Sequence, residues 1–575
     1  MSYNLETIVS RAKRKGFVYP WSDIYWGLAN ARDYGPYGVQ LKKNILDLRR
    51  RTFIQKRPDM IGLDANILMH PKVRETSGHV DNFDDPLIDD KNTGERFRAD
   101  KIIEDSIESM KNEKTEEVFL QLENLYRFKS AINTDLERRS LELKEWTEPI
   151  KKIKIKNISK DVLENIIKSW KAEQIFKTYN DQYSKIKDDQ NAINIPKLRE
   201  LKKLVESNIS QKLKEFWIEL KLPNLIPESR TFELMREYIV AYIPHNPNDK
   251  KKKKPAERTE VRKFQMMYYT YQWVVHDETG KIRMRPETAQ GIFVNFRNVL
   301  DTTRMRVPFG IGQVGKAFRN EITPGNFLYR TREFEQMEIE YFVENDKEKA
   351  MEAFNMRKEL SMDRRTNKIG LNPEKVKFRE HETDELSHYS DGTFDVDYKF
   401  PWGRGELQGI AYRTDFDLRN HQESSGKNMQ YADPYTGQRY IPHVIEPSFG
   451  LSRTVLTAML DAYDEEEYTD GNGKTQTRTV ARFHPDIAPV KYAILPLIKK
   501  DADQVRIAHE IYAKLSMDCV VEYDDGGAIW KRYRRQDEIG TPYCITVDHQ
   551  SVEDGTVTLR HRDDMSQERV KIEDL

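Results

Sequence analysis

The sequence predicts an α+β protein with three kinds of segment: a core of antiparallel or mixed sheet, a largely helical insertion in that core, and a small C-terminal α/β domain. Three observations predict this organisation. No glycine occurs between Gly94 and Gly280, although the chain has 27. Glycine, proline and alternating apolar residues flank that interval on both sides. Beyond about residue 481 the pattern becomes strand–helix–strand.

The composition limits the class of protein. Its 575 residues favour three or four domains of about 150 residues each. The 95 lysines and arginines are balanced by 95 acidic residues, so a nucleic-acid contact must come from local basic patches. The two cysteines, Cys519 and Cys544, argue against a cysteine-type zinc site and a disulfide framework. With no signal peptide and no apolar run near eighteen residues, we expect a cytoplasmic protein without a membrane span.

The glycine-free interval is expected to be helical, because tight turns that need positive φ favour glycine. In "SLELKEWTEPI" and "PKLRELKKLVESNISQKLKEFWIELKL" apolar residues recur three and four apart, which is typical of amphipathic helices. These helices are expected to be solvated and without chemistry of their own. The five lysines 250–254 indicate either a mobile loop or a phosphate contact.

The core after this insertion contains an unusual hairpin, "FRNEITPGNFLYRTREFEQMEIEYF" (Phe318 to Phe342). We expect a turn at Pro324-Gly325-Asn326, with Arg319 and Glu321 on one face of the first arm. Side chains alternate along a strand, so the second arm has an apolar face and a polar face. The apolar face holds Met337, Ile339 and Tyr341, and the other holds Arg330, Arg332, Phe334, Gln336 and Glu338.

This polar row runs from cations through an aromatic ring and an amide to a carboxylate. Phe334 and Glu338 would lie about 13 Å apart on a strand, which suits an extended ligand such as a nucleotide beside an amino acid. The alternative is a surface hairpin of cross-strand salt bridges. Two other segments favour a ligand-binding site over a surface hairpin: "RPETAQG" with Arg285 and Glu287, and "EPSFGLSR", which leads into a helix. A helix N-terminus with an arginine in its first turn is a natural anion site.

Together these segments resemble the class II aminoacyl-tRNA synthetases. "DYGPYGVQLKKNI" resembles motif 1, "FRNE…TREFEQME" motif 2 and "EPSFGLSR" motif 3. Three segments are similar in sequence to glycyl-tRNA synthetases of the homodimeric type: "GFVYPWSDIYWGLANARDYGPYGV", "RPETAQGIFVNF" and "KRYRRQDEIGTPYCIT". The resemblance covers about residues 5–100 and 261–575 and leaves out the insertion.

The resemblance implies an antiparallel sheet flanked by helices and a C-terminal α/β anticodon-binding domain. The expected division is 1–100 (first part of the catalytic core, with motif 1), 101–260 (mainly helical insertion), 261–480 (second part, with motifs 2 and 3) and 481–575 (anticodon-binding domain). The implied reaction activates glycine with ATP to glycyl-adenylate and transfers the glycyl group to the 3′ end of tRNA(Gly). The implied partners are glycine, ATP with Mg²⁺, tRNA(Gly) and a second copy of the chain, without zinc.

The resemblance also assigns roles in the ATP site. Arg319 would contact the α-phosphate and Arg453 the γ-phosphate, as the catalytic residues. Glu321 would accept from the adenine amino group, Phe334 would stack on adenine, and Glu406 is the candidate Mg²⁺ ligand. The full expected ATP set is Arg319, Asn320, Glu321, Tyr329, Arg330, Thr331, Arg332, Glu333, Phe334, Glu406, Leu407, Gly450, Leu451, Ser452 and Arg453.

For glycine, the resemblance places Glu287, Glu338 and Glu446 around the ammonium group. A site crowded by its own side chains can reject larger amino acids sterically. The full expected set is Arg98, Glu287, Phe334, Glu335, Gln336, Met337, Glu338, Glu446, Pro447, Ser448, Phe449 and Gly450. For tRNA we expect Lys531, Arg532, Arg534 and Arg535, with a solvated helix face as the alternative.

Two other functions compete with this interpretation. A class II synthetase for threonine, proline or histidine shares the three motifs, but the three glutamates and "RPETAQG" argue against it. A synthetase-like accessory protein that binds nucleic acid would usually lose Arg319 or Arg453, and both are present.

Overall fold

The structure is a computed structural model that describes residues 4–27, 31–112, 235–236, 239–240, 243–249, 255–272, 280–364, 368–381, 390–469 and 473–575. The chain forms two compact units, Met1–Asp84 with Gln265–Leu575, and Asp85–Phe264. We describe each unit by itself. The lysine run 250–254 and most of the expected insertion helices lie outside the described residues.

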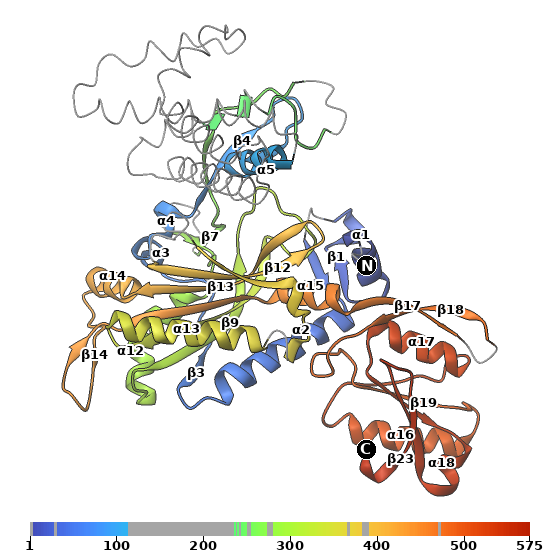
Figure 1. The fold of residues 1–575 in the computed structure, drawn as a ribbon. Coiled ribbons are helices and arrows are strands. Elements are labelled where there is room, and N and C mark those ends of the chain that lie inside the picture. The colour runs from blue at the N-terminus through green and yellow to red at the C-terminus, as the bar shows by residue number, and fades with distance from the viewer. Residues whose placement is uncertain are drawn as a thin grey trace, which may run out of the picture. The chain divides into compact units, whose positions relative to one another are not determined.

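A seven-stranded sheet forms the centre of the first unit, in the order β11-β12-β13-β16-β10-β9-β3 (Figure 1). All neighbours are antiparallel except β3 and β9, which are parallel. This confirms the expected antiparallel sheet. Its strands are β3 (Met60–Leu63), β9 (Phe309–Phe318), β10 (Glu333–Val343), β11 (Val376–Glu380), β12 (Gly392–Phe400), β13 (Gly403–Thr414) and β16 (His443–Gly450).

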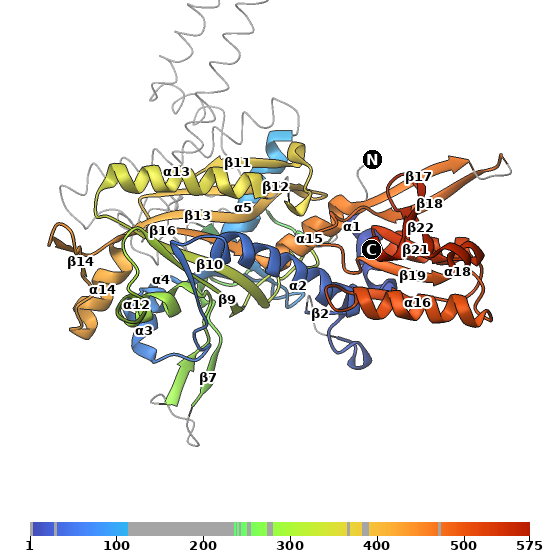
Figure 2. The same cartoon turned by 90° about the horizontal axis from the view of Figure 1, so that it is seen from below.

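Helices cover both faces of this sheet (Figure 2): α13 (Lys347–Arg364) lies on one side and α12 (Ala289–Thr303) on the other. Alternation along β10 determines which side chains meet each layer. Met337, Ile339 and Tyr341 join the apolar cluster that contains Phe354 of α13. Their neighbours Gln336, Glu338 and Glu340 point to the opposite face, where the polar site lies.

The connection between β9 and β10 differs from the expected tight hairpin. β9 ends at Phe318 and β10 begins at Glu333, so Arg319, Glu321, Arg330 and Arg332 lie in a loop and not on strand faces. Placing them in the strand row was wrong. The loop is anchored inward by the core residues Phe327 and Leu328, with Asn326 and Phe327 at positive φ. Anchoring of this kind interrupts the alternation that a strand would have.

Two helices of the first unit pack against each other: α2 (Pro36–Arg50) and α15 (Leu451–Ala462). The second of them also contacts β10. Pro36 occupies the first turn of α2, where its missing N–H is not needed. Leu41 and Ile45 of α2 share an apolar cluster with Leu451 and Val455 of α15.

The C-terminal part forms a five-stranded sheet in the order β20-β19-β21-β22-β23. β19 is parallel to β20 and β21, whereas β21 and β22 are antiparallel, which confirms a partly parallel α/β domain. The elements are β19 (Tyr492–Pro496), α16 (Ala502–Leu515), β20 (Val521–Tyr523), α17 (Ile529–Ile539), β21 (Tyr543–Val547), α18 (His549–Asp554), β22 (Thr556–His561), β23 (Gln567–Lys571) and η6 (Ile572–Asp574).

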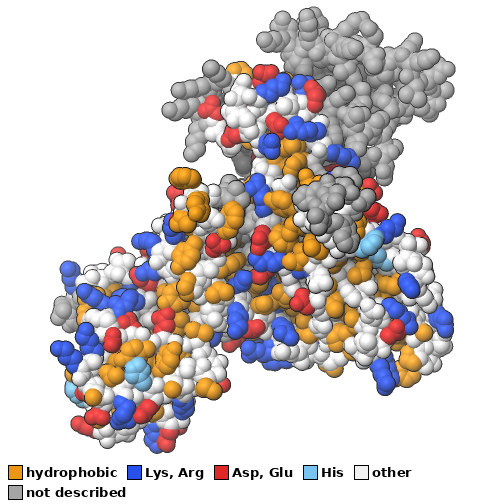
Figure 3. All heavy atoms as spheres, turned by 180° about the vertical axis from the view of Figure 1, so that it is seen from behind, with side chains coloured by type: hydrophobic (Ala, Val, Ile, Leu, Met, Phe, Trp, Pro, Cys, Tyr) orange, Lys and Arg blue, Asp and Glu red, His pale blue; other side chains and the backbone are white. Residues whose placement is uncertain are grey.

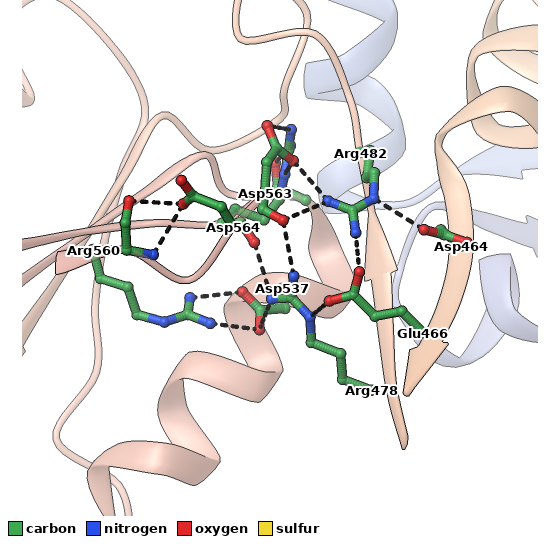
Figure 4. A network of polar contacts seen from close by, with 11 residues as sticks. Asp464, Glu466, Arg478, Arg482, Asp537, Arg560, Asp563 and Asp564 are labelled. Carbon is green, nitrogen blue, oxygen red and sulfur yellow. Dashed lines mark hydrogen bonds and ion pairs between the residues drawn. The ribbon is translucent and has the colours of Figure 1, made fainter. Parts of the chain in front are cut away.

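A buried ionic network connects this domain to the hairpin of β17 (Tyr463–Thr469) and β18 (Thr475–Ala481), as Figure 4 shows. Asp537 of α17 is fully buried and accepts from Arg478 of β18 and from Arg560 of β22. Arg482 pairs with Asp464 of β17 and Asp563 beyond β22. The side chains of Arg478 and Asp537 are fully buried, so loss of either one would leave a charge without its partner in the interior and is strongly destabilising.

The second unit contains a three-stranded sheet in the order β5-β4-β6 and the helix α5 (Ala99–Asn112). The strands are β4 (Asp84–Asp89), β5 (Arg96–Arg98) and β6 (Arg262–Gln265). The second compact unit thus runs from Asp85 to Phe264, whereas the sequence led us to expect an insertion over 101–260. β4 and β5 precede residue 101 and share their sheet with β6.

The remaining elements are short. They are α1 (Leu5–Arg14), β1 (Val18–Pro20), η1 (Asp23–Tyr25), β2 (Arg32–Tyr34), η2 (Arg51–Gln55), α3 (Pro71–Thr76), α4 (His79–Asn82), β7 (Tyr269–Tyr271), β8 (Lys281–Arg283), η5 (Pro373–Lys375), α14 (Phe416–Ser425), β14 (Tyr431–Ala432) and β15 (Arg439–Tyr440). None of the helices in the described residues combines the length and the apolar composition that are needed to cross a membrane.

Gly38 of α2 gives a test of this packing. A Cβ added there would lie 1.8 Å from the carbonyl oxygen of Phe17, whereas one added at Gly62 meets nothing within 4 Å. We expect Gly38→Ala to lower the free energy of unfolding by about 1–3 kcal/mol through overpacking. Gly62→Ala is the control and should change it by less than about 0.5 kcal/mol. Calorimetric unfolding of the two variants checks this, and equal stabilities would contradict it.

Candidate active site

Glu338 lies at the centre of the polar face of the sheet, with only 2 % of its surface exposed. The register of β10 and β16 places it opposite Ser448, whose hydroxyl donates to Glu338 Oε1 at 2.9 Å. The backbone N–H of Thr288 donates to Oε2 at 2.6 Å, and the Thr288 hydroxyl donates to the same oxygen. These bonds hold the carboxylate in one position. Burial, and then the nearby charge of Glu287, still raise the pKa of Glu338.

Glu287 lies just before α12 and is paired with an arginine from another element. Its carboxylate accepts from the N–H of Gln290 at 2.9 Å and pairs with Arg74 of α3. Burial alone would raise the pKa of Glu287. Arg74, His79, the N–H of Gln290 and Arg413 together outweigh burial and lower the pKa to about 2. Nearby, burial lowers the pKa of His79 to about 4, so this imidazole is neutral at pH 7.

Glu446 of β16 is paired in a similar way with Arg413 of β13, at 2.9 Å. The β13–β16 register shifts between Tyr412 and Thr414, so Arg413 is the extra residue of a β-bulge. Arg413 also binds both carboxylate oxygens of Asp417, at 2.8 and 3.0 Å. Burial raises the pKa of Glu446 to about 7 despite Arg413.

The structure thus brings Glu287, Glu338, Glu446 and Ser448 together, and it adds partners that sequence reasoning missed. Arg74 and Arg413 neutralise part of the negative charge. Asp417 orients Arg413, and Gln290 in turn donates to Asp417. Of these contacts, only the one between Arg413 and Asp417, which are four residues apart, has a local sequence pattern from which it could be predicted. Arg74 lies 213 residues from Glu287, and no local pattern connects the two.

The other end of the polar face is cationic. Arg453, in the first turn of α15, lies 3.0 Å from the carboxylate of Glu406 and stacks on Tyr329, 4.5 Å from the ring centroid. Arg319 lies over Phe334, 5.4 Å from that ring centroid, and donates to the carbonyl of Pro286 at 3.1 Å. The guanidinium groups of Arg319 and Arg453 thus lie toward the N-terminal end of β10, and the buried carboxylates lie farther along the sheet, from the middle of β10 onward.

Arg285 has a structural contact in the middle of this face. Its guanidinium donates to the carbonyls of Lys316 and Ala65, at 2.6 and 2.8 Å. A Cβ on Gly315 would lie 2.1 Å from Arg285 Nη2, so a side chain at this position would displace the guanidinium.

Several side chains expected at the site lie elsewhere. Glu335, Met337, Pro447 and Phe449 point to the other face, because they alternate with Glu338 and Ser448 along their strands. Glu335 pairs there with Lys42 at 2.6 Å, and Met337 and Phe449 belong to the apolar core.

The side chains of Leu407 and Leu451 are likewise core residues, so only their backbone could face a nucleotide. Glu333 pairs with Lys316 at the surface, and the Thr331 hydroxyl donates to the Glu333 carbonyl at 2.8 Å. Arg98 belongs to the second unit, where it pairs with Asp85 at 3.1 Å and Asp100 at 2.7 Å.

The basic run on α17 divides into structural and exposed members. Arg532 is 3 % exposed and donates to the carbonyls of Pro496 and Gly527, at 2.6 and 2.9 Å. It is therefore a structural residue and not, as we expected, a surface group that contacts tRNA. Its helical position turns it inward. Arg534 stacks on Tyr468, and Arg535 pairs with Asp524 at 2.5 Å. Lys531 is exposed beside Trp530, which is 60 % exposed and was not foreseen.

The antiparallel sheet, with an arginine after β9, a second arginine in the first turn of α15 and an α/β domain that follows, defines a class II aminoacyl-tRNA synthetase. A glycine–tRNA ligase of Alkaliphilus oremlandii (strain OhILAs) is 42 % identical over 571 residues, which cover 99 % of this chain and 96 % of the relative. One from Staphylococcus aureus (strain bovine RF122 / ET3-1) is 41 % identical over 576 residues, 100 % of this chain and 98 % of the relative. The chain belongs to the glycine–tRNA ligase family.

Two family models match parts of the chain. An anticodon binding domain matches residues 491–575, and glycyl-tRNA synthetase insertion domain 1 matches residues 85–169. Among solved structures, prolyl-tRNA synthetase from Cryptosporidium parvum, complexed with L-proline and AMP, is similar with a TM-score of 0.41. It is 18 % identical, and the match covers 54 % of this chain and 60 % of that one.

Arg532 and Arg535 give a matched test of the corrected assignment. We expect Arg532→Met to lower the free energy of unfolding of the C-terminal domain by at least about 2 kcal/mol, because buried carbonyls lose their donors. Arg535→Met should change it by less than about 1 kcal/mol, since it breaks one exposed ion pair. Chemical denaturation measures both, and a stable Arg532→Met protein would contradict a structural role.

Proposed function

We propose that the chain activates glycine with ATP to glycyl-adenylate and then transfers the glycyl group to the 3′ end of tRNA(Gly). The observation that carries this proposal is the polar order along β10. The guanidinium groups of Arg319 and Arg453 lie toward the N-terminal end of β10, and the buried carboxylates of Glu338 and Glu446 lie beyond them, from the middle of the strand onward. An ammonium group fits the carboxylates and a polyphosphate fits the guanidinium groups.

In the first step, a carboxylate oxygen of glycine attacks the α-phosphorus of ATP. The new C–O–P bond forms as the bond to the pyrophosphate oxygen breaks, and pyrophosphate leaves. Arg319 offsets the charge that develops on the α-phosphate, and Arg453 holds the leaving phosphates. The carboxylate is already a nucleophile, so catalysis depends on positioning and electrostatics and not on a general base. Glu321 and Phe334 hold the adenine.

Magnesium is expected to enter with ATP, because it screens the phosphates and prefers oxygen ligands. Glu406 remains our candidate ligand. Its Oε2 pairs with Arg453 at 3.0 Å in this structure, and its other carboxylate oxygen is the one that would be offered to the metal. We propose no structural zinc, since both cysteines, Cys519 and Cys544, lie in the C-terminal domain and none lies in the insertion.

For tRNA, the exposed members of α17 are the candidates that remain. Lys531, Arg535 and the exposed ring of Trp530 combine positive charge with a stacking surface. On the face shown in Figure 3, basic and acidic side chains are interspersed over the described residues. Binding should therefore depend on such local groups and not on a broad positive field.

Pyrophosphate exchange tests the proposed function. The protein should exchange pyrophosphate into ATP with glycine but not with alanine or serine, because the pocket is buried and filled by its own side chains. Glu338→Gln should reduce glycine-dependent exchange by at least about tenfold. Glu335→Gln is the matched control, because this neighbouring glutamate points to the opposite face. Equal exchange with alanine, or none with any amino acid, would refute the proposal.

We also propose that the chain works as a homodimer in the cytoplasm. The N-terminal loop exposes a group of large apolar side chains: Ile24 is 84 %, Tyr25 71 % and Trp26 95 % exposed. Contiguous apolar groups of this kind are typical of protein–protein interfaces. They lie just before β2 and α2, the segment that resembles motif 1. The unpaired cysteines agree with a reducing compartment.

The dimer proposal predicts that Ile24→Ser combined with Trp26→Ser increases the dissociation constant of the dimer at least about tenfold, because apolar burial is lost. Sedimentation velocity over a range of protein concentrations measures this. Met517→Ser is the control, since Met517 is 84 % exposed but lies in the C-terminal domain. A wild-type protein that sediments as a monomer at all concentrations would contradict the proposal.

A further inference from the structure

Glu340 is a buried carboxyl that the proposed mechanism does not use. It lies two residues beyond Glu338 on the same face of β10, and none of its surface is exposed. Neither of its carboxylate oxygens has a hydrogen-bond partner among the described residues. A buried ionised carboxylate without hydrogen bonds is strongly unfavourable, so such a group takes up a proton.

The strand register places Glu340 beside a glutamate of the glycine pocket. Glu338 pairs with Ser448 and Tyr341 with Ile445, so Glu340 lies opposite Glu446 across β10 and β16. Side chains opposite each other on one face have Cβ atoms about 5 Å apart. Two buried carboxyls at that distance do not both ionise, and one proton remains with the pair. Burial, and then the charge of Glu446, raise the pKa of Glu340 well above its ordinary value.

The groups around this pair come from every neighbouring element. The charged ones are Glu338 on β10, Arg413 on β13 and Asp417 on α14. β9 places Ile311 opposite Glu340, and α12 directs Gln290 to Asp417 and Phe293 to Arg413. The only cation that acts strongly on Glu340 among the described residues is Arg413, whose guanidinium is already bound to Asp417 and Glu446. The carboxylates around Glu340 therefore outnumber the cations, and the ammonium group of glycine enters a pocket with excess negative charge.

We propose that Glu340 and Glu446 share one proton in the empty pocket, and that the ammonium group of glycine displaces this proton to solvent when it binds. The inference rests on the proposed function. The pocket gains one positive charge from the substrate and loses one with the proton, so its net charge does not change. Glu340 is thus a positioning residue that sets the charge of Glu446 and does not itself touch glycine.

This coupling predicts a pH dependence with a definite sign. Below the pKa of the pair, the empty pocket holds a proton that the loaded pocket lacks. Glycine affinity therefore rises with pH, by up to about tenfold per pH unit, and levels off once the pair is ionised. Burial is the main cause of the raised pKa of Glu446, and we infer that the like charge of Glu340 adds to it. In Glu340→Gln this charge is absent, so the KM for glycine should vary less steeply with pH than in the wild-type protein between about pH 6 and 8.

Calorimetry of a non-reactive glycyl-adenylate analogue, with a sulfamoyl group in place of the phosphate, measures the proton directly. Titration into the wild-type protein near pH 6.5, in two buffers of different ionisation enthalpy, should show release of about one proton. The same analogue with acetyl in place of glycyl lacks the ammonium and should release none. Release of less than about 0.3 protons by wild type would overturn the inference, and this result needs no variant.

The Glu340→Gln variant tests whether Glu340, and not another carboxylate of the pocket, is responsible for the released proton. Glu340→Gln should still bind the glycyl analogue but release clearly fewer protons than the wild-type protein. A variant that releases as many protons as wild type would overturn the role of Glu340. If the glycyl analogue does not bind wild type at all, the proposed function fails and the inference fails with it. Tight binding without proton release overturns the inference alone.

Discussion

The pairing of β10 with β16 is the constraint on which the rest of the site depends. It places Ser448 opposite Glu338 and Glu446 opposite Glu340, so four polar side chains from two distant segments share one buried face. The glycyl end of the proposed reaction exists only in this register, because a slip by one residue would turn each of these side chains into the apolar layer beneath α13. The apolar residues Met337, Ile339 and Phe449 hold the register from the other side.

The charge of this site depends on the arginines that pair with the glutamates as much as on the glutamates themselves. Arg74 keeps Glu287 ionised, whereas Glu446 is left with a pKa of about 7 although Arg413 is bound to it. Asp417 competes for the same guanidinium through two hydrogen bonds. The three glutamates are therefore not equivalent, and a count of carboxylates does not give the charge that a substrate meets.

Sequence reasoning could predict the antiparallel core, the partly parallel C-terminal domain and the clustering of Glu287, Glu338 and Ser448, because strand alternation and long motifs are local signals. It misplaced Arg319 and Arg332 on strands, since Phe327 and Leu328 pull the intervening loop into the core and no local pattern shows this. Contacts such as Arg74 with Glu287 join segments far apart in the chain. The inward turn of Arg532 follows from how α17 packs on its sheet.

The network around Asp537 has a consequence for how the chain can be divided. A fragment that begins at residue 491, where the match to the anticodon binding domain starts, would contain Asp537 and Arg560 but would lack Arg478 and Arg482. The buried carboxylate would lose a cation and Asp563 would lose its cross-domain partner. A C-terminal fragment that keeps this network intact must therefore include β17 and β18, which lie outside the matched residues 491–575 and continue directly from α15, the helix that carries Arg453.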